Sequence, residues 1–232
     1  MKKVLIIEDD REIVNLLEIH LNDIGCEVIK AFNGVDGLHL AFTEKIDLII
    51  LDISLPKKNG LEVCKEIRLK QSTPIIMLTA KTEEIDKVLG LEVGADDYIT
   101  KPFSIREFIA RVKSIFRRLK MDSEKVISPK NIELNFKNLM INIERRKITQ
   151  DGKKIELSPK EFELLVLMAT NPGKNYSRAN LLSIIWGYDF TGYEHTVNSH
   201  INRLRAKIEP NMAHPTYILT TWGIGYRFNE EL

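Results

Sequence analysis

Apolar residues follow two kinds of spacing along the first 118 residues of the chain. Short continuous runs rich in Ile, Leu and Val predict β-strands. The longer stretches between them, with apolar residues three or four positions apart, predict amphipathic helices. In REIVNLLEIHLNDIG, for example, Ile13, Leu17 and Leu21 share one face, and Gly25 ends the helix. The predicted strands cover residues 4–8, 26–32, 47–52, 74–80 and 95–102.

This alternation of strands and helices predicts an α/β fold, a doubly wound five-stranded parallel sheet with helices on both faces. The runs LIIL and PIIML contain no polar position, which is expected of strands that are buried on both faces. In a sheet of this type with strand order 2-1-3-4-5, functional groups gather beyond the carboxyl ends of the strands, near the point where the strand order reverses.

A different pattern follows residue 120. MDSEKVISPK, residues 121–130, has no periodicity and predicts a linker between a first domain at 1–120 and a second domain at 131–230. The second domain is predicted to be α+β. Four short antiparallel strands, with a turn at Asp151-Gly152, precede three helices and a final aromatic hairpin.

The helices of the second domain carry sequence signals at their ends. Ser158, Pro159 and Glu161 form the pattern of a capping box with proline at the first helical position. Ser177 is predicted to cap the second helix, and Pro210 to stop the third.

Composition is that of an ordinary globular protein. Of the 232 residues, 29% are charged and 44% hydrophobic, and the net charge of +1 divides into −1 over residues 1–120 and +2 over residues 121–232. This asymmetry is too small to indicate a nucleic-acid-binding domain by itself. No apolar run is long enough to cross a bilayer, and MKKVLIIEDD reaches acidic residues too early for a signal peptide, so we expect a cytoplasmic protein without membrane insertion. Cys26 and Cys64 are too few for a disulfide framework and are predicted to be reduced and buried.

Acidic side chains interrupt two of the most apolar runs at their carboxyl ends. Glu8 and Asp9 follow the first strand and Asp52 ends the third, and these strands are neighbours in the predicted order. Carboxylates held this close raise each other's pKa unless a cation neutralises them. Oxygen ligands of this kind suit Mg²⁺, which keeps several waters and completes its shell with phosphoryl oxygens.

Two further strand ends bring complementary groups. Thr79 lies at the end of the fourth strand and Lys101 at the end of the fifth, so a hydroxyl and an ammonium group are expected near the carboxylates. These groups are what a phosphoryl group on Asp52 would need. Taken singly, each residue is more often explained as a cap, a turn residue or a solvated lysine. Their common register at four strand ends favours a site.

The strand-end residues resemble the site of a CheY-like receiver domain. By this resemblance Asp52 is the phosphoacceptor, and Mg²⁺ or Mn²⁺ is held by Asp9, Asp52 and the backbone carbonyl of Ser54, with Glu8 acting through water. The matching residues are the Glu8-Asp9 pair, Asp52, Thr79, Tyr98 and the Lys101-Pro102-Phe103 segment.

The resemblance also implies a switch. Lys101 would pair with the phosphoryl oxygens, Thr79 would move toward them, and Tyr98 would swing inward behind Thr79. An ordinary half-buried strand tyrosine is the alternative for Tyr98. Only interactions that differ between two surface states can shift the populations of those states, and Thr79 and Tyr98 would supply that difference.

Charged residues on the predicted fourth helix, fifth strand and fifth helix resemble the set through which receivers of the OmpR/PhoB type dimerise. A solvated helical face is the alternative, because exposed ion pairs contribute only about 0–1 kcal/mol each. The resemblance implies the intersubunit pairs Lys87–Glu107, Asp97–Arg111 and Asp96–Arg118, doubled by two-fold symmetry.

HTVNSHINRLRAK, residues 195–207, predicts an amphipathic helix with Val197, Ile201 and Leu204 on its buried face. A cationic helical face suits the DNA major groove, although solvation is the commoner explanation of such a face. Three helices and a glycine-containing hairpin resemble a winged helix-turn-helix of the OmpR/PhoB type. The resemblance implies DNA contacts from Thr196, Asn198, Ser199, His200, Asn202, Arg203, Arg205, Lys207 and, in the wing, Trp222.

The second domain departs from this family in its charge. His195, Asn202 and Trp222 stand where the family frequently has basic residues. Because phosphate neutralisation supplies much of the affinity for DNA, we expect weaker binding than in a strongly basic relative, or a greater dependence on dimerisation.

Together these features predict a DNA-binding transcriptional response regulator of a two-component system rather than an enzyme. A sensor histidine kinase is the expected phosphoryl donor, because the chain has no GxxxxGK[ST] motif for ATP. Double-stranded promoter DNA and, on phosphorylation, a second copy are the other expected partners, and the resemblance leaves open a contact with RNA polymerase. One alternative is a dedicated phosphatase, although the cluster has no separate general acid. The other is a regulator whose receiver dimerises without phosphorylation.

Overall fold

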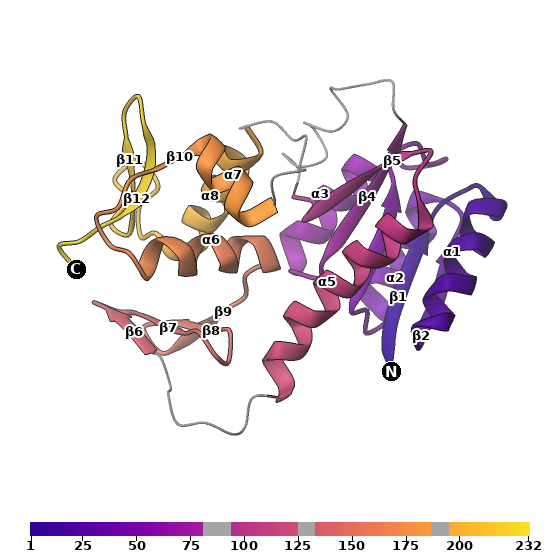
Figure 1. The fold of residues 1–232 in the computed structure, drawn as a ribbon, viewed down its shortest axis with the longest axis horizontal. Coiled ribbons are helices and arrows are strands. Elements are labelled where there is room, and N and C mark those ends of the chain that lie inside the picture. The colour runs from indigo at the N-terminus through magenta and orange to yellow at the C-terminus, as the bar shows by residue number, and fades with distance from the viewer. Residues whose placement is uncertain (81–93, 125–132, 187–194) are drawn as a thin grey trace. The chain divides into compact units, whose positions relative to one another are not determined.

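The computed structural model describes residues 1–80, 94–124, 133–186 and 195–232. These residues form two compact units, Met1–Ile115 and Phe116–Leu232 (Figure 1). Each unit has its own sheets, helices and apolar core.

A five-stranded parallel sheet forms the centre of the first unit. Its order is β2-β1-β3-β4-β5, which confirms the predicted α/β class and strand order. Every residue from Leu48 to Leu51 is 0% exposed, as predicted for a strand covered on both faces. The strands are β1 Lys2–Ile7, β2 Cys26–Ala31, β3 Leu48–Asp52, β4 Ile75–Ala80 and β5 Asp97–Lys101.

Helices cover both faces of this sheet, with α1 and α5 on one face and α2 and α3 packed together on the other (Figure 1). Asp10 caps α1 by accepting the backbone N–H groups of Glu12 and Ile13, and Gly25 follows its end with a φ of 77°, as predicted. The helix α5 includes the first residues of the range predicted as a linker, because MDSE contains no proline or glycine to stop it. The helices are α1 Arg11–Asp23, α2 Gly34–Thr43, α3 Gly60–Lys70 and α5 Ile105–Glu124.

The second unit combines antiparallel sheets with helices, which confirms the predicted α+β class. A four-stranded sheet has the order β6-β7-β8-β9, and a three-stranded sheet has the order β10-β12-β11. The short strand β10 was not predicted, because two residues carry too little pattern to identify a strand. The elements are β6 Glu133–Phe136, β7 Leu139–Asn142, β8 Lys147–Gln150, β9 Lys153–Ile155, α6 Pro159–Ala169, β10 Tyr176–Ser177, α7 Arg178–Trp186, α8 His195–Ile208, β11 Ile218–Thr221 and β12 Gly225–Phe228.

The predicted helix caps of the second unit are confirmed. The backbone N–H of Ser158 donates to Glu161 Oε2 at 2.9 Å, and the N–H of Glu161 donates to Ser158 Oγ at 3.4 Å, which completes the capping box. The N–H of Asn180 donates to Ser177 Oγ at 3.1 Å at the start of α7. These bonds satisfy backbone donors that a helix leaves unpaired at its first turn.

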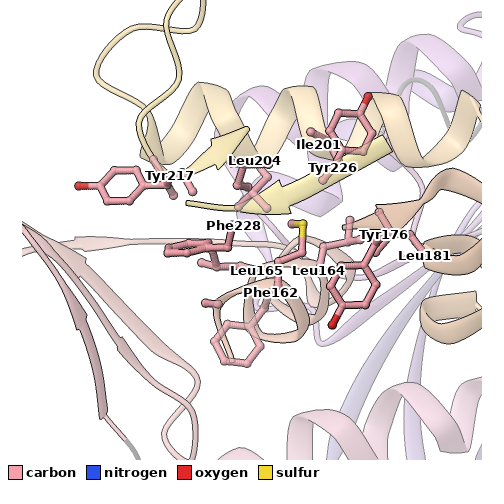
Figure 2. Close-up of a cluster of buried hydrophobic side chains, with 14 of the residues drawn as sticks. Phe162, Leu164, Leu165, Tyr176, Leu181, Ile201, Leu204, Tyr217, Tyr226 and Phe228 are labelled. Carbon is pink, nitrogen blue, oxygen red and sulfur yellow. The ribbon is translucent and has the colours of Figure 1, made fainter. Parts of the chain in front are cut away.

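The core of the second unit joins α6 and α8 to the hairpin of β11 and β12. Figure 2 shows Phe162 and Leu165 from α6, Leu204 from α8 and Phe228 from β12 converging in one apolar cluster. All four are at most 5% exposed. This packing fixes α8 against the hairpin within the unit.

Candidate functional site

Three carboxylates meet at the carboxyl edge of the parallel sheet. Glu8 and Asp9 follow β1, and Asp52 is the last residue of the neighbouring strand β3. One oxygen atom from each of the three lies within 4.8 Å of the others. Glu8 and Asp52 are 1% and 4% exposed, whereas Asp9 is exposed. The predicted acidic cluster is therefore present, with two of its members buried.

The loop after β3 folds back over the end of the strand. The backbone N–H of Ser54 donates to Asp52 Oδ2 at 3.2 Å, and the N–H of Gly60 donates to the Ile53 carbonyl at 2.9 Å. A Cβ atom on Gly60 would lie 2.0 Å from the carbonyl oxygen of Asp52. Only glycine fits this close approach, so Gly60 holds the loop in the position that orients Asp52.

Lys101 joins the cluster from the end of β5. Its Nζ atom lies 2.6 Å from Glu8 Oε2 and 3.1 Å from Asp52 Oδ1, and the peptide bond between Lys101 and Pro102 is cis. Thr79 and Tyr98 are 1% and 7% exposed on the adjacent strands β4 and β5. Tyr98 is thus already buried in this structure.

Burial and mutual repulsion disfavour the charged forms of these carboxylates, and Lys101 compensates for this only in part. Burial, together with the charge of Asp52, raises the pKa of Glu8 to about 7, although the hydrogen bond from Lys101 acts in the opposite direction. Burial and the charge of Asp9 also raise the pKa of Asp52. For Lys101, burial alone would lower the pKa, but the bond to Glu8 and the charge of Asp52 outweigh it and raise the pKa. The ammonium group of Lys101 contacts two of the three carboxylates, and this group of hard oxygen donors is consistent with a divalent metal site.

The raised pKa of Glu8 gives a stability that depends on pH. Between its ordinary value of 4.5 and about 7, the folded chain keeps a proton on Glu8 that the unfolded chain has released. This contribution is complete below the unfolded pKa and is lost as the pH rises through the folded pKa. In metal-free buffer, the unfolding free energy of the wild type minus that of Glu8→Gln should therefore fall by about 1–3 kcal/mol as the pH rises from 4.5 to about 7. Urea unfolding of both proteins at several pH values measures this difference in free energy. A difference that does not change with pH contradicts the predicted effect of Glu8 on stability.

The residues predicted to form a dimer surface are only partly described. Lys87 and the side chain of Arg118 lie outside the described part of the chain. Arg111 Nη1 donates to Asp97 Oδ1 at 2.9 Å, and Arg111 Nη2 donates to Glu107 Oε1 at 2.8 Å. The predicted partners Asp97 and Arg111 thus form a pair within one chain, on the surface of β5 and α5.

Asp96 is buried within the single chain, and its predicted intersubunit pair with Arg118 stays a prediction. The residue is 1% exposed, and its Oδ2 atom accepts from Arg68 Nη2 at 2.7 Å and from the N–H of Ile75 at 3.0 Å. Arg68 is held in turn by the carbonyls of Gly94 and Thr73. Asp96 therefore ties α3 to the starts of β4 and β5.

The apolar face of α8 is buried as predicted. Val197, Ile201, Leu204 and Ile208 are each 0% exposed. The opposite side carries a polar stripe on which His195, Ser199 and Asn202 recur at helical spacing, with Asn198 half-buried beside it.

Three predicted DNA contacts on α8 are buried and were assigned wrongly. Thr196 and His200 are 0% exposed, and His200 Nδ1 lies 2.9 Å from the Thr196 carbonyl. Arg205 is 9% exposed, and its Nε and Nη2 atoms donate to the Ile218 carbonyl at 3.1 and 2.7 Å. The buried stripe of a packed helix is wider than its apolar residues alone, so flanking polar residues are buried with it.

The other two cations of α8 lie beside a buried carboxylate. Lys207 Nζ is 2.7 Å from Glu161 Oε2, and Arg203 Nε is 3.7 Å from Glu161 Oε1. Glu161 is 0% exposed. The sequence predicts Glu161 only as a capping residue, because nothing in the sequence connects it to side chains more than forty positions away.

The hairpin of β11 and β12 exposes apolar side chains at its turn. Trp222 is 91% exposed and Ile224 is 49% exposed, on either side of Gly223 with its φ of 75°. Trp222 lies at the turn between β11 and β12, which is the tip of the predicted wing.

Both halves of the chain match known protein domains. Residues 4–113 match the response regulator receiver domain, and residues 152–228 match the C-terminal domain of transcriptional regulatory proteins. The fold and the acidic site therefore define a response regulator with a DNA-binding output domain of the winged helix-turn-helix type, not a catalytic enzyme.

Solved structures give the family. DrrB from Thermotoga maritima, described as an OmpR/PhoB homologue, is 33% identical, with 99% of each chain covered and a TM-score of 0.50. The chain belongs to the OmpR/PhoB family of two-component response regulators. A mutant of RitR shares the fold at 24% identity and a TM-score of 0.71, over 99% of this chain and 100% of that chain. A streptococcal protein described as a redox sensor that evolved from two-component response regulators is 25% identical, with the same coverage and a TM-score of 0.50.

No helix among the described residues is long and apolar enough to span a membrane.

Proposed function

We propose that this protein is a transcription factor whose binding to promoter DNA is controlled by phosphorylation of Asp52. The observation that carries the proposal is the buried Asp52 carboxylate with Lys101 Nζ at 3.1 Å and two further carboxylates beside it. A kinase and DNA are partners that the two domains imply in general. The proposal adds a sensor histidine kinase as the donor and Asp52 as the acceptor.

Each residue of the cluster has a distinct part in the transfer. A carboxylate oxygen of Asp52 attacks the phosphorus atom, and the bond to the nitrogen of the donor histidine breaks. Lys101 holds a negative phosphoryl oxygen with its ammonium group. Mg²⁺ or Mn²⁺, held by Asp9, Asp52 and the carbonyl of Ser54, with Glu8 acting through water, would neutralise charge on the phosphoryl group.

Transfer of the phosphoryl group adds negative charge at Asp52, next to side chains of the neighbouring strands. A phosphorylated side chain carries roughly two negative charges and three strong acceptor oxygens. Lys101 now shares its donors between Glu8 and Asp52, and the phosphoryl oxygens compete for them. The hydroxyl of Thr79 is the second donor proposed to turn toward them, with Tyr98 packing behind it. These changes favour one of two surface states of β5 and α5.

The surface that responds is proposed to form a homodimer. Asp97, Glu107 and Arg111 form a charged cluster on one chain. A second copy related by two-fold symmetry can exchange partners with this cluster, and Lys87 and Arg118 complete the proposed set. Dimerisation would place two output domains on one DNA and so raise the affinity for two half-sites together. A contact with RNA polymerase stays a prediction from the resemblance.

A redox switch, as described for the streptococcal relative, has less support in this chain. Cys26 is 6% exposed and Cys64 is 0% exposed. Burial raises the pKa of the Cys26 thiol, which disfavours the reactive thiolate. The acidic cluster is the stronger candidate for the switch.

Asp52 should be the only residue that acquires a stable phosphoryl group from acetyl phosphate and Mg²⁺. Intact mass measures the adduct, and sedimentation of the same samples measures the dimer. We expect both in the wild type and neither in Asp52→Ala. Glu62→Gln, on the exposed part of α3, is the control that should keep both. An adduct of equal yield in Asp52→Ala contradicts the proposed acceptor.

Charge reversal at Glu107 should weaken the dimer without unfolding the monomer. The side chain is 47% exposed and its pair with Arg111 is a surface pair, so the stability of the monomer should change by no more than about 1 kcal/mol. We expect phosphorylated Glu107→Lys to sediment mainly as a monomer. Glu62→Lys introduces the same charge change on α3 and should still dimerise, and unchanged dimerisation of Glu107→Lys contradicts the proposed surface.

Substitutions of Arg203 and Arg205 should have different main effects, the first on DNA binding and the second on the stability of the fold. Arg205→Ala leaves the Ile218 carbonyl without its buried donor, so it should lower the unfolding free energy by roughly 1–3 kcal/mol. Arg203→Ala removes a half-buried cation and should lower the affinity for a duplex enriched from a randomised pool, and reduce its salt dependence, with less effect on stability. Thermal unfolding and fluorescence anisotropy measure the two effects, and equal destabilisation by both variants contradicts this division.

A further inference from the structure

Two asparagines on α8, Asn198 and Asn202, differ in which hydrogen-bonding atoms of their side-chain amides are available to a ligand. Asn202 is exposed on the polar stripe, and no residue of the described chain is hydrogen-bonded to its side chain. Asn198 is half-buried, and its Oδ1 atom accepts from Arg178 Nε at 2.8 Å and from the Tyr226 hydroxyl at 2.9 Å. The Asn202 amide is thus an open donor and acceptor pair, whereas the acceptor of Asn198 is already in use.

The orientation of the Asn198 amide is fixed by its partners. The Nε atom of an arginine can only donate, so the amide oxygen must face Arg178, because the reverse orientation would set two donors against each other. Both lone pairs of that oxygen are occupied by Arg178 and Tyr226. Only the NH₂ group of Asn198 is left to meet a ligand.

The partners of Asn198 are themselves held in place. The guanidinium carbon of Arg178 lies 5.6 Å from the centre of the Tyr226 ring, and that of Arg205 lies 5.5 Å from the centre of the same ring. Arg205 is anchored to the Ile218 carbonyl of β11. Asn198 is therefore fixed by residues from α7 and from the hairpin, and turning its amide would disrupt contacts among several elements.

Recognition of adenine by asparagine needs both ends of the amide. The oxygen accepts from the adenine N6 amino group while the nitrogen donates to N7. Asn202 meets this requirement and Asn198 does not. We infer that Asn202 recognises adenine in the major groove, and that Asn198 acts only as a donor, to a phosphate oxygen. This division rests on the DNA-binding function proposed above.

Selection of duplexes from a randomised pool tests the inference with the full-length, phosphorylated protein. The variants are Asn202→Ala, Asn202→Gln and Asn198→Asp. Aspartate keeps the oxygen that Arg178 and Tyr226 bind, replaces the outward donor with an acceptor and adds a negative charge. The wild type should prefer adenine at one position, with a loss of roughly 5- to 100-fold when that base is changed. Asn202→Ala should remove this preference.

Asn198→Asp should lower the affinity for all enriched duplexes by a similar factor and leave the adenine preference intact. Asn202→Gln retains both amide groups and should keep more of the preference than Asn202→Ala. Thermal unfolding should show that Asn202→Ala is as stable as the wild type, because its side chain is exposed and alanine favours helix.

The inference is overturned if Asn198→Asp abolishes the adenine preference, or if wild type and Asn202→Ala enrich the same sequences. In the second case the DNA-binding function stands and only the division between the asparagines fails. If the wild type enriches no duplex at all, the proposed DNA binding itself is wrong, and the inference falls with it.

Discussion

The first unit depends on the contact of one ammonium group with carboxylates from two other strands. Lys101 at the end of β5 reaches Glu8 after β1 and Asp52 at the end of β3. Parallel pairing in the order β2-β1-β3-β4-β5 brings these strand ends to one edge. The compensation is incomplete, because burial raises the pKa of both Glu8 and Asp52. A site in this condition favours an added cation and responds strongly to a change of charge at Asp52.

The cations of α8 in the second unit do not form a simple basic surface, because they contact groups within the same domain. Arg205 serves the hairpin, and Lys207 and Arg203 lie beside the buried carboxylate of Glu161. The hydrogen bonds of Arg205 and Lys207 hold α8 in the domain, and the outward side of α8 is a polar stripe with little charge. Affinity for DNA should then depend on hydrogen bonds from that stripe and on the joining of two output domains, since counterion release scales with the number of neutralised phosphates.

Local sequence signals predicted most of the fold. Apolar runs, the caps at Ser158 and Ser177, and the carboxylates at the strand ends all act within a few residues or through the strand order, and the structure agrees with them. Partners distant in sequence were not predictable. Asp96 and Asp97 look alike in the sequence, but Arg68 binds the first inside the unit and Arg111 binds the second on the surface. Likewise, the basic residues of α8 gave no indication of which would be used for folding.

The central claim is that a phosphoryl group on Asp52 changes the affinity of the chain for DNA. The most direct measurement is the dissociation constant for one enriched duplex, before and after treatment with acetyl phosphate and Mg²⁺, for the wild type and for Asp52→Asn. We expect tighter binding by roughly 5- to 150-fold in the treated wild type and no change in the variant, in line with typical coupling between two sites. Equal affinity in all four samples would contradict it.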